Sequence, residues 1–232
     1  MKTLIQISDC HIDDLPQSMG VNTHENLSTI LQNIANYSTD CLIITGDLAH
    51  NGSLKSYEII NNYLCSIEAD KVVLPGNHDN IENLKREFSD NILREYCLDN
   101  WGIISAYSKH ENQISGYLCV DELYQLDDAL KFSNAEHNIV ILHHPPVPMC
   151  SDWDDSLSLQ NMDDFFDIID KYPKIRAILW GHAHQSSEFN RNQIKLIACP
   201  STALQFDKEN RIGFNRYSLH ENGEFEYTTK WL

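Results

Sequence analysis

Positive charge is scarce in this 232-residue sequence. Lysine and arginine together number 17, against 34 aspartates and glutamates, so the formal net charge is -17. Proteins whose main partner is DNA or RNA usually present a basic face, and attraction to an anionic membrane surface also requires basic residues. The composition therefore disfavours nucleic acids and membranes as partners. An anionic substrate would need local positive charge, which bound metal cations can supply.

Long apolar runs and paired cysteines are also missing. No stretch approaches the roughly 20 apolar residues of a transmembrane helix. The apolar run after Lys2 is interrupted at Gln6, so it is too short for the hydrophobic region of a signal peptide. The seven cysteines are odd in number and contain no Cys-x-x-Cys pair, as expected of free thiols in a reducing compartment. We therefore predict a cytoplasmic protein.

What is present predicts an α/β fold. Short apolar runs rich in β-branched residues predict buried strands at 4–7, 41–44, 71–74, 139–142 and 177–180. Apolar residues at helical spacing predict helices at about 24–37 and 53–67, between the first three strands. The chain therefore begins with βαβ crossovers and a mainly parallel sheet.

The second half combines further helices with antiparallel hairpins. Helices are expected at 80–88, 122–132 and 162–172, and additional strands at 103–104 and 117–120. Two hairpins are expected near the end, one around Arg191-Asn192 and one around Asn222-Gly223. We find no repeat, low-complexity segment or linker, so residues 1–232 are predicted to form a single domain.

Polar residues of the metal-ligand type follow five of the predicted strands. In chain order these residues are Asp9 with His11, Asp47, Asn77 with His78, His143 with His144, and His182 with His184. A single histidine at a strand end is usually a surface or packing residue. Ligand-type residues at five strand ends are not readily explained by chance. If the strands form one open parallel sheet, these side chains converge on one edge, where α/β sheets bind their ligands. The remaining histidines do not repeat this placement, and we assign them to surface or packing positions: His24, His50, His110, His137 and His220.

The chemistry of this set predicts two metal ions. Imidazoles, carboxylates and an amide oxygen suit iron, manganese or zinc better than calcium or an all-oxygen magnesium site. The set exceeds what one tetrahedral ion needs, whereas two ions sharing a carboxylate would use it fully. A two-metal site clamps the attacking and leaving oxygens of an in-line displacement at phosphorus. No cysteine joins the set, which argues against a structural zinc site.

Five motifs together resemble the calcineurin-like metallophosphoesterases. They are Asp9-x-His11, Gly46-Asp47, Gly76-Asn77-His78-Asp79, His143-His144-Pro145 and Gly181-His182-Ala183-His184. Within that superfamily the chain is most similar to bacterial cyclic AMP phosphodiesterases of class III. The stretch from Trp153 to Asn161 and the stretch from Pro200 to Phe206 add to this similarity. The resemblance implies a four-layer αββα sandwich of mixed α/β type.

The resemblance also implies a role for each motif residue. One metal would be held by Asp9, His11 and His184, and the other by Asn77, His143 and His182. Asp47 would bridge the two ions together with a hydroxide that attacks phosphorus in line. His78 would protonate the leaving oxygen, with Asp79 as the candidate to orient it, and Asn77, His78 and His184 would contact the substrate. His143 is chosen over His144 because the family's ligand stands two residues before the proline.

The implied reaction is hydrolysis of 3',5'-cyclic AMP to 5'-AMP, with iron or manganese, or zinc, as the two metals. An alternative is a broader phosphodiesterase or phosphomonoesterase acting on glycerophosphodiesters or 2',3'-cyclic nucleotides. A remote alternative is a non-catalytic binding subunit, although such a protein should have lost ligands that this chain retains. The partner is thus expected to be a small phosphodiester, and a homodimer is left open. Trp153 could stack on a nucleobase or pack its own loop, and the sequence leaves both open.

Overall fold

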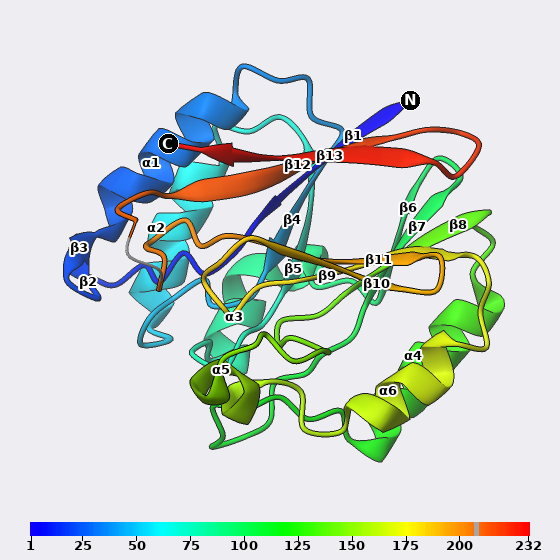
Figure 1. Ribbon diagram of the computed structural model, residues 1–232. Coiled ribbons are helices and arrows are strands. Elements are labelled where there is room, and N and C mark those ends of the chain that lie inside the picture. The colour runs from blue at the N-terminus through cyan, green and yellow to red at the C-terminus, as the bar shows by residue number, and fades with distance from the viewer. Residues whose placement is uncertain (207–208) are drawn as a thin grey trace.

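The computed structural model of the protein describes residues 1–206 and 209–232 and contains two large β-sheets between helices (Figure 1). The first sheet has the strand order β13-β12-β1-β4-β5. Its strands are β1 (Lys2–Ile7), β4 (Cys41–Thr45), β5 (Asp70–Leu74), β12 (Gly213–Leu219) and β13 (Phe225–Trp231). Strands β1, β4 and β5 are parallel, whereas β12 and β13 form an antiparallel hairpin at the β1 edge. The parallel start and antiparallel finish predicted from the sequence are therefore confirmed.

The second sheet has the order β10-β11-β9-β8-β7-β6. Its strands are β6 (Glu95–Leu98), β7 (Trp101–Ser105), β8 (His137–Ile141), β9 (Ile175–Trp180), β10 (Ser187–Arg191) and β11 (Ile194–Ala198). The four central strands are parallel, and β6 and β10 close the edges in antiparallel pairing. A small ribbon of β2 (Gln17–Ser18) and β3 (Val21–Asn22) lies before the first helix.

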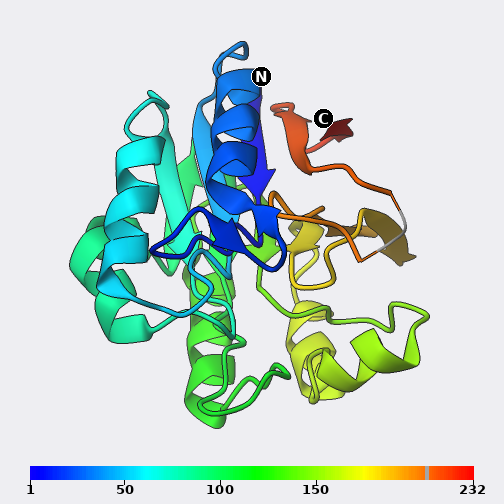
Figure 2. The same cartoon turned by 90° about the vertical axis from the view of Figure 1, so that its left-hand side faces the viewer.

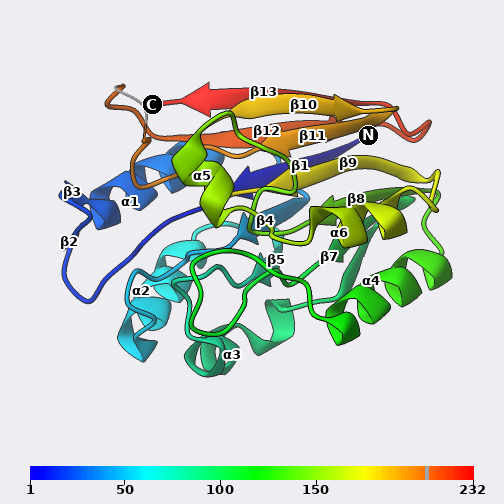
Figure 3. The same cartoon turned by 60° about the horizontal axis from the view of Figure 1, so that its bottom comes forward.

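Helices cover the outer faces of both sheets. Helices α1 (Thr23–Ile34), α2 (Leu54–Leu64) and α3 (Ile81–Phe88) lie beside the first sheet, and Figure 2 shows α1 and α2 in front of its strands. Helices α4 (Val120–Phe132) and α6 (Met162–Ile169) cover the second sheet (Figure 3). The short helix α5 (Asp152–Leu157) and the 3-10 turn Ser89–Asn91 lie in connections. No helix in residues 1–206 or 209–232 is long and apolar enough to cross a membrane.

Three buried apolar clusters account for four layers. Alternate residues of a strand point to opposite faces of its sheet. In β4, Leu42 and Ile44 pack on the helices of the first sheet, whereas Cys41 and Ile43 pack against the second sheet. In β8, Val140 packs on α4 and α6 in the same way. One apolar layer is thus shared by the two sheets, which gives the αββα sandwich that the motifs imply.

Several predicted elements differ from the observed ones. The strand predicted at 117–120 is wrong, because α4 begins at Val120 and the residues before it lack a partner strand. Leu118 instead exchanges backbone hydrogen bonds with the side-chain amide of Asn161. The sequence does not predict strand β6 or helix α5, because four and six residues carry little periodic signal and α5 is also mostly polar.

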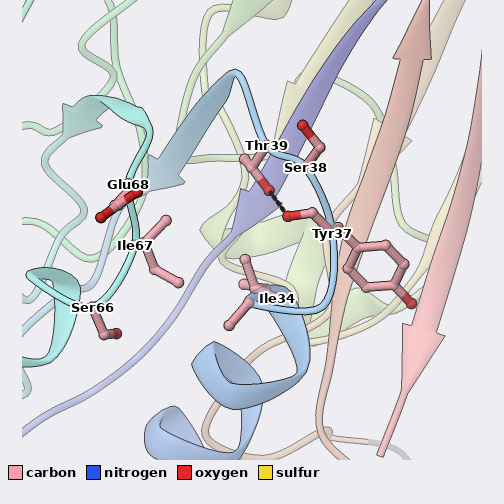
Figure 4. Close-up of a pocket in the computed structure, with 8 residues that line it drawn as sticks. Ile34, Tyr37, Ser38, Thr39, Ser66, Ile67 and Glu68 are labelled. Atoms are coloured by element: carbon pink, nitrogen blue, oxygen red, sulfur yellow. Dashed lines mark hydrogen bonds between the residues drawn. The ribbon is translucent and has the colours of Figure 1, made fainter.

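A surface cavity of about 360 Å³ lies away from the candidate ligands. It lies where α1 and α2 end, and it is lined by Ile34, Ala35, Tyr37, Ser38, Thr39, Ser66, Ile67 and Glu68 (Figure 4). These segments immediately precede β4 and β5. The cavity therefore lies at the amino ends of strands whose carboxyl ends carry the predicted metal ligands.

Candidate metal centre

The loops that carry the predicted ligands have strained backbone conformations. Five of the seven predicted ligands have positive φ angles: Asp9 (54°), His11 (46°), Asp47 (50°), His182 (66°) and His184 (47°). Residues other than glycine rarely adopt this region, and such strain concentrates at functional sites. Two of the loops also support each other, because Asp9 N–H donates to Gly46 O at 3.0 Å and His11 N–H donates to Asp47 O at 3.0 Å.

Asp47 lies between two groups of donors. Its Oδ2 is 3.4 Å from His143 Nε2 and 3.8 Å from His11 Nε2. His11 Nε2 in turn lies 3.0 Å from His184 Nε2, which is 3.6 Å from an Asp9 carboxylate oxygen. One set of donor atoms comes from Asp9, His11 and His184, and a second set comes from Asp9, Asp47 and His143. Within each set, all donor atoms lie within 4.8 Å of one another. Either set can hold a metal ion.

Asn77 lies close to the histidine donors on the other side of Asp47. Its Oδ1 lies 3.1 Å from His143 Nε2 and 3.0 Å from His182 Nδ1. His144 lies close by, but both of its nitrogens have other partners, at 2.8 Å from Ser108 Oγ and 2.9 Å from Ile114 O. The geometry therefore favours His143 over His144 as the ligand. The structure brings all seven predicted ligands together.

Two of the ligand histidines are held by backbone carbonyls at the nitrogen that faces away from the site. His143 Nδ1–H donates to Thr45 O at 2.8 Å, and His184 Nδ1–H donates to Leu204 O at 2.8 Å. A hydrogen bond of this kind fixes the tautomer and ring orientation of a metal-binding histidine. In the neutral form, both rings therefore present an unprotonated Nε2 toward Asp47 and Asp9.

Burial and neighbouring charges shift the pKa values of these donors in both directions. It lowers the pKa of His184 to about 4 and that of His182 to about 3, so both imidazoles are neutral at pH 7. Burial alone would raise the pKa of Asp47, but His143 and other histidines hold it well below its usual range. Burial raises the pKa of Asp9 to about 7. The Asp47 carboxylate outweighs burial at His143 and raises its pKa to about 9, so His143 carries a proton and Asp9 is partly protonated at pH 7. Metal ligation requires neutral imidazole and ionised carboxylate, so a cation would bind here with release of these protons.

Two glycines are required because the loops approach each other closely. A Cβ at Gly76 would collide with the carboxylate of Asp47, and a Cβ at Gly181 would collide with the side chains of Ser8 and Asp9. Any larger residue would push a ligand out of position. The glycine before Asn77 and the glycine before His182 therefore serve the packing of the ligand loops.

His78 lies at the exposed edge of the site and is oriented by His50. Its Nδ1–H donates to the backbone oxygen of His50 at 2.9 Å, and the two rings stack at 5.0 Å with an interplanar angle of 21°. His50 Nδ1 is also 3.4 Å from His11 Nδ1. His50, which the sequence places among surface or packing residues, packs against the candidate proton donor His78. Its position three residues after Asp47, in the same strand-end loop, was the available signal.

Asp79 occupies a different place from the one predicted. Its buried carboxylate accepts hydrogen bonds from the backbone N–H groups of Leu48, Ala49 and Gly76 and from Tyr57 Oη, at 2.9–3.2 Å. No hydrogen bond in the described part of the chain joins it to the His78 ring, so the predicted orienting contact is wrong. Asp79 instead fastens the loop after β4 to the turn after β5.

Comparison with known proteins identifies the family. Residues 2–186 match the family model of calcineurin-like phosphoesterases, which is well over half of the chain. The chain belongs to the calcineurin-like phosphoesterase family. Members use binuclear divalent metals, in agreement with the donor set described above.

Relatives of this phosphoesterase match it over nearly its full length. It is 51% identical over 230 residues to a protein named probable cyclic nucleotide phosphodiesterase from Vesicomyosocius okutanii, covering 99% of each chain. It is 32% identical to the 3',5'-cyclic adenosine monophosphate phosphodiesterase CpdA of Pseudomonas aeruginosa, covering 96% of this chain and 87% of the relative. Among solved structures it is similar to a dimetal phosphatase from Danio rerio, with a TM-score of 0.71, 13% identity and coverage of 95% and 93%. That last similarity concerns the fold alone.

Metal binding should stabilise this phosphoesterase measurably. Adding manganese to protein stripped with a chelator should raise Tm by roughly 5–10 °C, since a ligand at one hundred times its Kd contributes about 2.7 kcal/mol. Magnesium should give a smaller rise, because the site offers more nitrogen donors than magnesium prefers. Differential scanning fluorimetry in the two metals measures both shifts. Equal shifts, or no shift with manganese, would contradict the donor assignment.

Proposed function

We propose that this chain is a two-metal phosphodiesterase that hydrolyses 3',5'-cyclic AMP to 5'-AMP. The observation that carries the proposal is the convergence of seven metal-type donor residues, with Asp47 at their centre and His78 at the open edge of the site. The relatives named as cyclic nucleotide and cyclic AMP phosphodiesterases supply the substrate class. We propose that residues 1–232 act as one domain in the cytoplasm, with a small phosphodiester as partner.

The donor distances support a division of ligands between two ions. Asp9, His11 and His184 would hold one ion, and Asn77, His143 and His182 would hold the other. Asp47 would bridge them, because its carboxylate faces His11 on one side and His143 on the other. When bound, the two ions would supply positive charge for the phosphate and lower the pKa of a bound water. The nitrogen-rich set favours iron or manganese, with zinc as a further candidate.

His78 is the proposed proton donor. Hydrolysis forms a new phosphorus–oxygen bond to water and breaks the bond from phosphorus to the ribose 3' oxygen, which must gain a proton. With Nδ1–H engaged by His50 O at 2.9 Å, the Nε2–H of a protonated His78 is free for that oxygen. His78 N–H also donates to Asp47 Oδ1 at 2.8 Å, which ties the donor to the bridging carboxylate.

A substrate panel tests the proposed activity. Manganese-loaded protein should turn over 3',5'-cyclic AMP with a kcat/KM at least tenfold above those for 2',3'-cyclic AMP, glycerophosphocholine and a simple phosphomonoester. Chromatography of the reaction mixture follows the loss of each substrate and identifies 5'-AMP as the product of cyclic AMP hydrolysis. Equal rates across the panel would favour the broad phosphoesterase instead. A manganese-loaded protein that is inert on all four would revive the non-catalytic binding subunit.

A further inference from the structure

Two exposed aromatic rings extend the metal centre on the side of His184. Phe206 stacks on the His184 ring with centroids 4.2 Å apart and an interplanar angle of 5°. Trp153 meets Phe206 nearly at a right angle, with an interplanar angle of 86° and centroids 5.4 Å apart. Phe206 is 46% exposed and Trp153 is 58% exposed. The three rings form a continuous path from a proposed metal ligand to the surface.

The backbone fixes Phe206 in this position. Phe206 N–H donates to His184 O at 3.4 Å, and His184 Nδ1–H donates to Leu204 O at 2.8 Å. The loop between these residues is tied to helix α1, since Asn26 Nδ2–H donates to Ala203 O at 2.7 Å. The Phe206 ring therefore has a defined orientation beside the metal centre. Ordered aromatic rings make good recognition surfaces because little conformational entropy remains to be lost on binding.

Trp153 contacts the Phe206 ring from a different secondary-structure element. It stands on helix α5, and its ring contacts Phe206 in the segment after β11. Ser151 caps this helix by accepting a hydrogen bond from Asp154 N–H at 3.3 Å, and Asp155 accepts one from Met149 N–H. Neither Trp153 nor Phe206 belongs to the three apolar clusters of the described chain. Core packing therefore does not account for leaving these two large rings in water.

We propose that Phe206 and Trp153 form a stacking platform for the nucleobase of the substrate. This inference rests on the proposed function. Two rings at a right angle form a corner, in which a flat base can lie face-on against one ring with its edge against the other. Stacking on aromatic side chains is the usual way in which proteins hold an unpaired base. A base there and its ribose phosphate at the metals place one nucleotide across both parts of the site.

The charge pattern favours an uncharged ring over an anionic group at this platform. The first turn of α5 carries Asp152, Asp154 and Asp155 around Trp153. A second phosphate, or an anionic lipid surface, would be repelled by these carboxylates. The proposed cations lie at the other end of the path, so the single phosphate binds there and the base points toward α5. Because stacking tolerates different bases, cyclic GMP should be bound as well as cyclic AMP.

A comparison of two substrates tests the platform. One is 3',5'-cyclic AMP, and the other is ribose 3',5'-cyclic phosphate, which has the same diester and no base. In the Phe206→Ala and Trp153→Ala variants, the ratio of kcat/KM for the first to that for the second should fall roughly 10- to 100-fold. Phe206→Tyr and Trp153→Phe, which keep a ring, should retain most of the ratio. The matched control is Phe132→Ala, because Phe132 is 67% exposed at the end of α4, and it should keep the wild-type ratio.

Each contrary result has a distinct meaning. If both alanine variants lose activity on the two substrates in equal proportion, Phe206 and Trp153 only support the metal centre and the platform is overturned. A wild-type ratio near one also overturns the platform, while leaving the phosphodiesterase proposal intact. If neither substrate is hydrolysed, the proposed function fails, and calorimetric binding of 5'-AMP against ribose 5-phosphate decides the platform. At least tenfold tighter binding of 5'-AMP, lost in the alanine variants, supports it, and equal binding overturns it.

Discussion

Replacing Asp47 with alanine should reduce turnover by on the order of 10³-fold and leave less than one metal ion per chain. Asp47 is the carboxylate that faces both donor groups, at 3.4 Å from His143 Nε2 and 3.8 Å from His11 Nε2. Without it, Asp9 would be the only carboxylate left among the proposed ligands of two divalent cations. Elemental analysis of purified protein and kcat/KM on 3',5'-cyclic AMP measure the two effects.

Two further variants separate metal loss from unfolding. Asp47→Asn keeps an oxygen that can accept the hydrogen bond from His78 N–H but removes the negative charge, so it should fold and still lose metal. Asp128→Ala removes an exposed carboxylate on α4 and should keep both metals and full turnover. An Asp47→Ala protein that retained two ions per chain would refute the bridging assignment.

Replacing His78 with alanine should lower kcat roughly 10²- to 10⁴-fold on cyclic AMP while both metals stay bound. The reason is that the 3' oxygen is a poor leaving group without a proton, and His78 is held with its Nδ1–H on His50 O. A diester with 4-nitrophenol as leaving group needs no proton and should lose much less rate. Steady-state kinetics on the two substrates, with metal content measured on the same sample, test this difference.

The alternative role for His78 is ligation. Donor nitrogens of His11, His50 and His78 lie within 4.8 Å of one another, so three imidazoles are close enough to hold an ion. If metal content falls together with activity in His78→Ala, or if both substrates lose rate equally, His78 is a ligand and not the acid. His110→Ala is the matched control, because His110 is an exposed histidine in a different loop, and it should change neither value.

The ligand residues were predictable because their signal is local. Each is within four residues of the end of an apolar run, and a run of four to six such residues is enough to predict a buried strand. The preference between His143 and His144 also agrees with the geometry, since both His144 nitrogens are engaged elsewhere. Asp79 differs, because the choice between the His78 ring and the backbone of the preceding loop depends on how two turns pack together.

The contact between Trp153 and Phe206 also depends on tertiary packing and could not be predicted from the sequence. Trp153 stood in a predicted loop and could be given two roles, and Phe206 was only part of a family motif. Their contact with each other and with His184 joins segments after β8, β9 and β11, which no periodicity in the sequence relates. The contact of His50 with His78 is not predictable from the sequence, because it is made by a backbone oxygen and a stacked ring. Neither contact depends on a recognisable spacing of residues.

By itself the sequence determined where strands end and which ligand-type side chains stand there, since strand propensity and turn residues act over a few neighbours. Only the tertiary structure divided those strands between two sheets, with Asp9, Asp47 and Asn77 at the ends of one and His143 and His182 at the ends of the other. A single open sheet, as the apolar pattern alone suggested, is wrong. The division depends on strand pairing and on the apolar layer shared by the sheets, which are contacts between residues far apart in the chain.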